Sequence, residues 1–203
     1  MSAAADICPL SAARWADFET VLGASGKSGC WCMYWRHATS AAFRAGAEGG
    51  AEAANRDAFR ARVEEGPPPG LLAYQGGEPV AWARVTPRAD LPGLARSRNF
   101  RIEGAGEGIW SLSCFVARPR GRGTGLTEAL PRAALAFAAE GGATALEVYP
   151  TEIDRAAARR PASAIYTGVS STFLRLGFEV VARRTPDRPL MRRRIGSERC
   201  DAP

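Results

Sequence analysis

The sequence has no long hydrophobic run, and this absence argues against a membrane-spanning helix. No stretch approaches the roughly 18 uninterrupted apolar residues that such a helix requires. The first residues also lack the basic start and the apolar core of a signal peptide, and Asp6 comes early. We therefore expect a cytoplasmic protein that makes no contact with membranes.

Metal ligands and disulfide-forming residues are scarce as well. His37 is the single histidine, and the cysteines are scattered in an odd number that does not indicate a disulfide framework. Cys30 and Cys32 form no zinc site by themselves, because no second cysteine pair or histidine cluster supplies the remaining ligands. We expect reduced thiols and no bound metal. The cysteines are Cys8, Cys30, Cys32, Cys114 and Cys200.

Length and composition favour one domain with its own core. The chain has 203 residues, 46% of them hydrophobic, and a chain of this size buries most of its apolar surface without covalent cross-links. No internal repeat divides the sequence. We therefore expect a single domain over residues 1–203.

The net charge of +6 raises the hypothesis of a nucleic-acid-binding protein, since arginines bind phosphates. Arginines concentrate near the C-terminus, at residues 183–184 and 192–194. Aromatic residues are not interleaved with them, as a surface that stacks bases requires. Residues 190–195 fit a final edge strand better, because charges on an edge discourage aggregation. Nucleic acid is therefore an alternative partner and not the expected one.

The most informative segment is the stretch Arg-Gly-Arg-Gly-Thr-Gly-Leu at residues 120–126. An apolar run at residues 110–116 predicts a strand before it, and an alanine-rich pattern at residues 124–139, interrupted by Pro131, predicts a helix after it. Glycines let the backbone bring its N–H groups against a ligand, and a helix N-terminus adds the positive end of its dipole. The sequence therefore predicts a phosphate-binding turn.

The residues after the last glycine argue against the common nucleotide-binding loops. A P-loop requires Lys followed by Ser or Thr at this point, and Leu126-Thr127 stands there instead. A dinucleotide fingerprint fits at Gly121 and Gly123 but has Leu126 in place of its third glycine. A dinucleotide-binding domain remains as an alternative.

What remains is the pattern Arg-x-x-Gly-x-Gly from Arg120 to Gly125, which resembles the pyrophosphate-binding motif of the GCN5-related N-acetyltransferase (GNAT) superfamily. Residues 171–179 resemble a second family segment, in which the fourth helix ends in Leu-Gly-Phe and leads into a strand. Gly177 suits the end of a helix there. The resemblance covers residues 70–195 well. Residues 29–36 are similar only to a bacterial subgroup of unassigned substrate.

The resemblance implies an α/β (α+β) fold with a single mixed β-sheet flanked by helices. Residues 1–70 would supply the acceptor-side helices, and residues 71–195 the family core. The sequence pattern agrees, with a hairpin at residues 71–85 and a strand at residues 145–149. Residues 86–108 have few apolar side chains and are expected to form a surface loop.

The resemblance also implies acetyl-CoA as cosubstrate. In the family two parallel strands separate, the pantetheine arm lies in the gap like an extra strand, and a strand N–H polarises the thioester carbonyl. The strands at residues 110–116 and 145–149 would take these places. The residues expected to bind acetyl-CoA are Phe115, Val116, Arg120, Gly121, Arg122, Gly123, Thr124, Gly125 and Leu126.

A general acid is the less demanding catalytic role, because a thiol with a reference pKa of about 8.5 leaves easily as a thiolate. Many family members place a tyrosine near the thiol sulfur, but the matching residue here is Phe173. Tyr166 stands where relatives often hold the pantetheine with an asparagine. It is a candidate acid, and the alternative is an ordinary half-buried tyrosine.

Glu147 is the first candidate for the general base. It interrupts an apolar run that a parallel sheet covers on both faces, and a buried carboxylate is costly unless it is paired or used. Burial would raise its pKa toward neutrality, which suits a base. The alternative is an ion pair with one of the many arginines.

His37 is a second candidate base, because imidazole titrates near neutral pH, although a lone histidine is often structural. It follows a cluster of aromatic residues, Trp31, Tyr34 and Trp35. These side chains are candidates for the wall of the acceptor pocket, and the alternative is a place in the core.

The sequence thus predicts an acyl-CoA-dependent N-acetyltransferase that moves an acetyl group to a primary amine by direct attack in a ternary complex. The acceptor would be an amine of a small molecule or of a protein. No recognisable histidine partner supports a nucleophilic cysteine and a covalent acyl-enzyme. The alternative is a dinucleotide-binding or RNA-binding protein without acyl transfer. A homodimer through edge strands is a further option.

Overall fold

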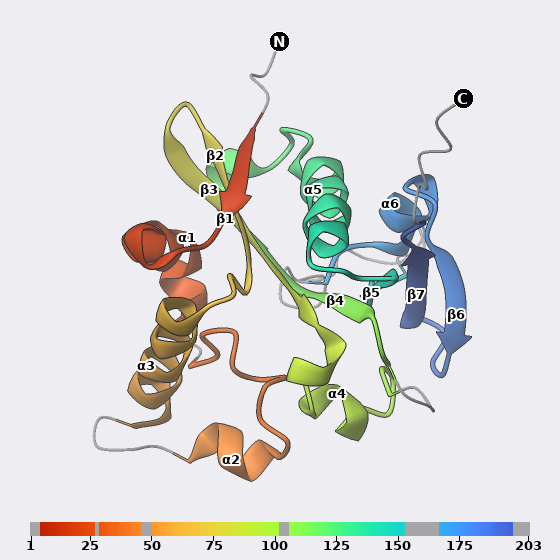
Figure 1. Cartoon of the computed structure of the whole chain (residues 1–203), viewed down its shortest axis with the longest axis horizontal. Coiled ribbons are helices and arrows are strands. Elements are labelled where there is room, and N and C mark those ends of the chain that lie inside the picture. The colour runs from red at the N-terminus through yellow and green to blue at the C-terminus, as the bar shows by residue number, and fades with distance from the viewer. Residues whose placement is uncertain (1–4, 27–28, 46–49, 102–105, 153–166, 197–203) are drawn as a thin grey trace.

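The polypeptide folds around one seven-stranded mixed β-sheet (Figure 1). The computed structural model describes residues 5–26, 29–45, 50–101, 106–152 and 167–196. The strand order is β1-β2-β3-β4-β5-β7-β6, with β4 and β5 parallel and the other neighbours antiparallel. The strands are β1 (Asp6–Pro9), β2 (Gly70–Gln75), β3 (Glu78–Pro87), β4 (Ile109–Ala117), β5 (Ala145–Val148), β6 (Glu179–Arg183) and β7 (Pro189–Arg194).

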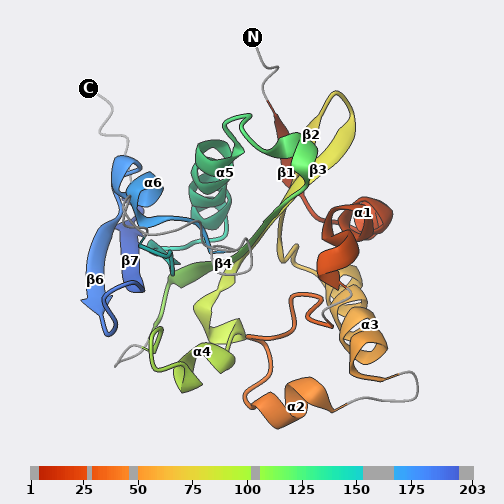
Figure 2. The same ribbon diagram turned by 180° about the vertical axis from the view of Figure 1, so that it is seen from behind.

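Helices cover both faces of the sheet (Figures 1 and 2). α1 and α3 lie against one face, and α5 and α6 lie against the other. No helix in the described ranges is long and apolar enough to cross a membrane. The helices are α1 (Trp15–Gly26), α2 (Ser40–Arg44), α3 (Gly50–Glu65), α4 (Gly93–Arg96), α5 (Leu126–Glu140) and α6 (Ser170–Arg175), with short 3-10 turns η1 (Ala12–Arg14), η2 (Arg88–Asp90) and η3 (Pro119–Gly121).

The two faces of the sheet have cores of different character. α5 presents a buried stripe at every fourth residue, Leu126, Leu130, Ala134 and Ala138, and this spacing places all four on one side of the helix. The opposite core is aromatic. The Phe18 ring of α1 lies 5.1 Å from Phe59 of α3 and 4.9 Å from Trp82 of β3, measured between ring centroids.

The hairpin, the central strand and the strand after α5 agree with the sequence patterns to within one or two residues. The hairpin turns at Gly76 and Gly77, whose φ angles of 57° and 81° are accessible to glycine at little cost. The predicted mixed sheet flanked by helices is therefore confirmed.

Three sequence expectations are wrong. The final strand, β7, is not an edge strand, because it pairs with both β5 and β6. The stretch 86–108 is no simple surface loop, since it holds η2 and α4 and buries Leu91 and Leu94. Pro131 does not interrupt α5, which continues to Glu140.

Candidate active site

β4 and β5 pair over only half of β4, and this leaves a gap in the sheet. The pairing runs from Ile109 opposite Ala145 to Leu112 opposite Val148. Beyond β5 the chain turns away, and Thr151 forms an isolated bridge with Val169 instead. Within the described part of the chain, the upper half of β4, residues 113–117, therefore has a strand neighbour on the β3 side alone. The family resemblance implies a separation of two parallel strands at this place.

A β-bulge lies where the gap begins. Arg84 of β3 pairs with Cys114, but the next residue, Val85, pairs with Leu112, so Ser113 is an extra residue in β4. A bulge of this kind breaks the alternation of side chains. Ser113 contacts Arg84, and Cys114 packs with the aromatic core on the α1 and α3 face. Phe115 packs with the α5 core on the opposite face.

The glycine loop between β4 and α5 leaves backbone donors free. Gly125 begins α5, and its carbonyl accepts the N–H groups of Glu128 and Ala129. Among the described residues, the N–H groups of residues 123–127 donate to no protein acceptor. The positive end of the helix dipole faces the same place. Donors in this arrangement bind an anionic group, and a phosphate suits them.

Glycine is required in the loop for different reasons at different positions. A Cβ at Gly121 would lie 2.9 Å from the Leu126 side chain and 3.1 Å from the Val80 carbonyl oxygen, so the backbones approach too closely for a larger residue. Gly123 and Gly125 have φ angles of 74° and 84° and face open space. The Thr124 hydroxyl closes the loop by donating to the Gly121 carbonyl at 2.8 Å.

Glu147 lies on β5, beside the half of β4 that pairs with β5, and its side chain is fully buried. Both of its carboxylate oxygens accept hydrogen bonds. Oε1 accepts from Arg192 Nη2 at 2.6 Å, and Oε2 accepts from Arg88 Nη1 at 3.0 Å and from the Tyr149 hydroxyl at 3.1 Å. Both carboxylate oxygens are therefore occupied by protein donors. Of the two alternatives that the sequence leaves open, the structure favours the ion pair.

Tyr149 completes this network on the α4 side of the sheet. Its hydroxyl accepts from Ser111 Oγ at 3.1 Å and from Arg88 Nη1 at 3.0 Å. Burial, and then the charge of Glu147, raise the pKa of Tyr149 above its usual range, so it stays protonated near neutral pH. The network ties η2 and β7 to the centre of the sheet through Arg88 and Arg192.

The described residues include no side-chain acid at the position where many family members place a tyrosine. Phe173 is buried in the α5 core, in contact with the Phe178 ring at 5.3 Å between centroids, and it carries no hydroxyl. Tyr166 lies outside the described residues. Its candidacy therefore stays a prediction.

His37 lies away from β4 and β5. Its Nε2 is 3.1 Å from Asn55 Oδ1, and its ring contacts Phe43 of α2. Asn55 is itself buried in the middle of α3, where it also donates to the carbonyl of Gly29 at 2.8 Å. Asn55 thereby joins α3 to the segments that contain His37 and Gly29.

The aromatic cluster divides between two cores. Trp31 is buried against Trp15 and Phe18 in the aromatic core, as the core alternative predicts. Trp35 packs against Phe100, in the same cluster as Tyr149. Tyr34 is the exposed member, with the Arg96 guanidinium 4.8 Å from its ring centroid.

Sequence reasoning misses a polar cluster beside the gap, formed by Cys32, Arg84, Ser113 and Cys114. Arg84 is 1% exposed and donates to Ser113 Oγ and to the Cys32 carbonyl. These residues come from three separate segments, and a bulge places two of them. The unusual Cys-x-Cys at residues 30–32 is the one signal in the sequence that points toward them.

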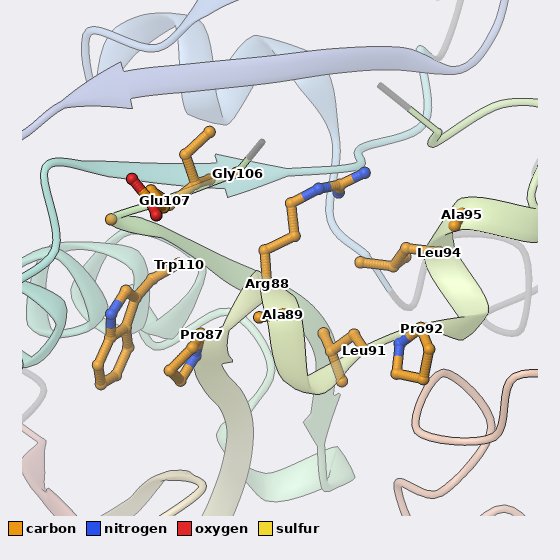
Figure 3. Close-up of a pocket in the computed structure, with 12 residues that line it drawn as sticks. Pro87, Arg88, Ala89, Leu91, Pro92, Leu94, Ala95, Gly106, Glu107 and Trp110 are labelled. Atoms are coloured by element: carbon orange, nitrogen blue, oxygen red, sulfur yellow. The ribbon is translucent and has the colours of Figure 1, made fainter. Parts of the chain in front are cut away.

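A cavity of about 500 Å³ lies at the opposite end of β4 from the glycine loop (Figure 3). Trp110 and Pro87 line one end of it, and Leu94 and Pro92 line the other. The Arg88 side chain passes along this cavity, and its guanidinium leaves it to reach Glu147. The cavity is therefore separate from the gap and the loop.

Comparison with known proteins identifies a family. A sequence profile described as the acetyltransferase (GNAT) family matches residues 33–160. No curated protein sequence matches the chain.

Solved structures of similar fold cover nearly the whole chain. An N-acetyltransferase from Staphylococcus aureus Mu50 has a TM-score of 0.53 at 12% identity, with 96% of this chain and 100% of that chain covered. The acetyltransferase yncA from Salmonella typhimurium, solved with its cofactor acetyl-CoA, has a TM-score of 0.53 at 16% identity, covering 99% and 100%. A phosphinothricin acetyltransferase from Sinorhizobium meliloti, in complex with acetyl-CoA, has a TM-score of 0.53 at 18% identity, covering 95% and 89%. At these identities the likeness shows a shared fold.

Proposed function

The chain belongs to the acetyltransferase (GNAT) family, and from that premise we propose that it transfers an acetyl group from acetyl-CoA to a primary amine by direct attack. The acceptor is an amine of a small molecule or of a protein. Both substrates are bound together, so no acyl-enzyme forms.

The free N–H groups of residues 123–127 carry this proposal. They point from the start of α5 with no protein acceptor in the described region, and they follow the strand that borders the gap. In the proposed complex they hold the pyrophosphate of acetyl-CoA. The structures with acetyl-CoA from Salmonella typhimurium and Sinorhizobium meliloti support a ligand of this class on this fold.

The charge around the loop suits the same ligand. Arg120 and Arg122 are exposed, and neither forms an ion pair within the described ranges. Their guanidinium groups are therefore available to the phosphates of coenzyme A. Binding of coenzyme A would account for the positive charge of Arg120 and Arg122 without a nucleic-acid partner.

The gap between β4 and β5 then receives the pantetheine arm. A backbone N–H of the upper half of β4 donates to the thioester carbonyl oxygen and stabilises the negative charge that forms there. The amine nitrogen attacks the carbonyl carbon, the carbon–sulfur bond breaks, and coenzyme A leaves as a thiolate. Phe115 and Val116 line this part of the strand on opposite faces.

Calorimetric titration with acetyl-CoA, NAD and a short RNA tests the ligand class. We expect acetyl-CoA to bind and the other two to fail. Gly123→Asp should abolish binding, because a carboxylate repels phosphate and Asp is strained at a φ angle of 74°. The matched control is Gly142→Asp, at a φ angle of 82° and equally in open space, beyond the other end of α5.

The control variant should bind acetyl-CoA like the unmodified protein. Binding of NAD or RNA without acetyl-CoA would contradict the proposal. A panel of primary amines, assayed by release of the coenzyme A thiol, then identifies the acceptor.

A further inference from the structure

Arg84 is buried beside the gap without a carboxylate partner. Its side chain donates to Ser113 Oγ from Nε at 3.0 Å and from Nη2 at 2.8 Å, and to the Cys32 carbonyl from Nη1. No acidic side chain in the described region lies within ion-pair distance of it. A buried charge without a nearby opposite charge is costly. A negative charge near Arg84 would therefore have to come from a residue other than Asp or Glu.

Cys32 supplies a sulfur placed to carry that negative charge. Its Sγ accepts the Trp82 Nε1–H at 3.2 Å, and since an indole N–H can only donate, the sulfur is the acceptor. The Cys114 thiol also donates to it. Despite burial, the hydrogen bond from Cys114, followed by the charge of Arg84, lowers the pKa of Cys32 to about 7.

The backbone around Cys32 is strained in a way that maintains these contacts. Trp31 and Cys32 have φ angles of 40° and 58°, in the left-handed region that favours glycine. Non-glycine residues are strained in this region, and such strain gathers at functional sites. In this turn the Cys32 carbonyl meets Arg84 while its sulfur meets Trp82.

Cys114 connects this buried sulfur to the gap. It lies in the upper half of β4, opposite Arg84, and is partly exposed, whereas Cys32 is 3% exposed. The hydrogen bond to Cys32, together with burial, raises the pKa of Cys114 well above its usual range. Cys114 therefore keeps its proton while Cys32 is the member of the pair that ionises.

We propose that Cys114 and Cys32 form a proton relay that deprotonates the acceptor amine, a role that rests on the proposed function. An N–H bond of the ammonium group breaks, and its proton binds Cys114 Sγ. The S–H bond of Cys114 breaks at the same time, and that proton moves to the Cys32 thiolate.

The neutral amine then attacks the thioester. After the attack the nitrogen loses a second proton, and the departing coenzyme A thiolate takes up one proton. Cys32 returns the first proton to solvent, so that the reaction is balanced. Cys114 is the catalytic residue in this scheme, and Cys32 acts through it.

The groups that face the pair favour a negative charge on it. From the described elements packed around it, α1 and α3 present apolar side chains such as Phe18 and Phe59. Asp90 is the acidic neighbour of Arg36, with 3.7 Å between Asp90 Oδ2 and Arg36 Nη2. The titratable and charged neighbours are Arg84 on β3, Arg36 and Cys30 on the segment of Cys32, and Asp90 beyond Arg36.

The first test needs no acceptor. The ultraviolet absorbance of thiolate is followed from pH 5 to 9 under reducing conditions in the unmodified protein, in Cys32→Ser and in Cys8→Ser. We expect one thiolate to form with a midpoint near pH 7, to be absent in Cys32→Ser and to persist in Cys8→Ser. Cys8 is the matched control, since it lies on β1. No thiolate below pH 8 would overturn the relay.

The second test is the pH dependence of kcat/KM with the amine that the panel identifies. The rate should rise through pH 7 as Cys32 ionises, and in Cys32→Ser this rise should move up to the pKa of the amine itself. Trp82→Phe removes one donor to the sulfur while keeping an aromatic ring, and should move the rise upward by a smaller amount. Cys114→Val should lower kcat by about 100-fold or more, the range of general-base catalysis, with acetyl-CoA binding retained.

Each failure has its own signature. An unchanged pH profile in Cys32→Ser, with acetyl-CoA binding intact, would overturn the relay alone. A protein that does not bind acetyl-CoA would overturn the proposed function and the relay with it. An acetyl group found on Cys114 or Cys32 by mass spectrometry before amine is added would replace the relay by a covalent mechanism.

Discussion

The lower half of β4, Ile109–Leu112, and its upper half, residues 113–117, belong to one strand but meet different surroundings. The lower half pairs with β3 and β5, and the network of Glu147 crosses it. Among the residues that the structure describes, the upper half pairs with β3 alone and leads into a loop whose N–H groups have no protein acceptor. The lower half thus stabilises the fold, while the upper half keeps backbone groups free for a ligand.

Two arginines, the partly buried Arg88 and the buried Arg84, show the same contrast. Arg88, beside the lower half, is paired with the Glu147 carboxylate at 3.0 Å. Arg84, beside the upper half, has a serine hydroxyl, a carbonyl and a nearby thiol. A thiol with a pKa of about 7, such as Cys32, gains and loses its proton near neutral pH. The first arrangement therefore suits stability, and the second suits proton transfer.

The largest effect should come from breaking the lower network. Glu147→Ala should lower the free energy of unfolding by about 3–5 kcal/mol, because it removes a fully buried carboxylate and leaves the partly buried guanidinium of Arg88 without its partner. Urea denaturation measures the change. Glu128→Ala, which removes an exposed ion pair with Arg175, should cost less than about 1 kcal/mol. Similar losses in the two variants would contradict the assigned role of the network.

Two buried serines of β4 sharpen the comparison further. Ser113→Ala should cost about 1–3 kcal/mol of unfolding free energy, because Arg84 loses the acceptor of two hydrogen bonds. Ser111→Ala should cost only about 1 kcal/mol, since the Tyr149 hydroxyl keeps Arg88 as a donor. Denaturant titration of both variants ranks them. A greater loss for Ser111→Ala would reverse the proposed order.

Two threonines compare the ends of β4 in ligand binding. Thr124→Val removes the hydroxyl that closes the glycine loop and should weaken acetyl-CoA binding about two- to tenfold, the range of one net hydrogen bond. Thr144→Val removes a similar bond, from Thr144 to the Gly108 carbonyl at 3.2 Å, at the opposite end of β4. Calorimetry should show unchanged binding for this control. Equal weakening would mean that the loop acts only through overall stability.

The smallest effect concerns exposed charge at the loop. Arg120→Gln should weaken acetyl-CoA binding by a factor of about 2–5 at low salt, because exposed charge pairs contribute up to about 1 kcal/mol. The difference should shrink as salt is added. Arg101→Gln, an exposed arginine after α4, is the control for net charge. If both variants weaken binding equally, the effect comes from net charge and not from the loop.

Local patterns in the sequence predicted what local forces hold. The glycine loop, the hairpin at Gly76–Gly77 and the stripe of α5 follow from glycine conformations and from helical spacing. The stretch 86–108 was misjudged because its few apolar residues, Leu91 and Leu94 among them, are buried by contacts with distant segments. The polar contacts of Asn55 could not be predicted for a similar reason, since its partners lie outside its own helix.

The sequence by itself determined the glycine loop and the family, because both depend on residues close together in the chain. The tertiary structure alone decided the partners of Glu147 and the meeting of Cys32, Arg84 and Cys114. Residues of the same type, such as Arg84 and Arg88, are indistinguishable in the sequence. The two arginines differ only because strand pairing, a bulge and burial give them different neighbours in the folded protein.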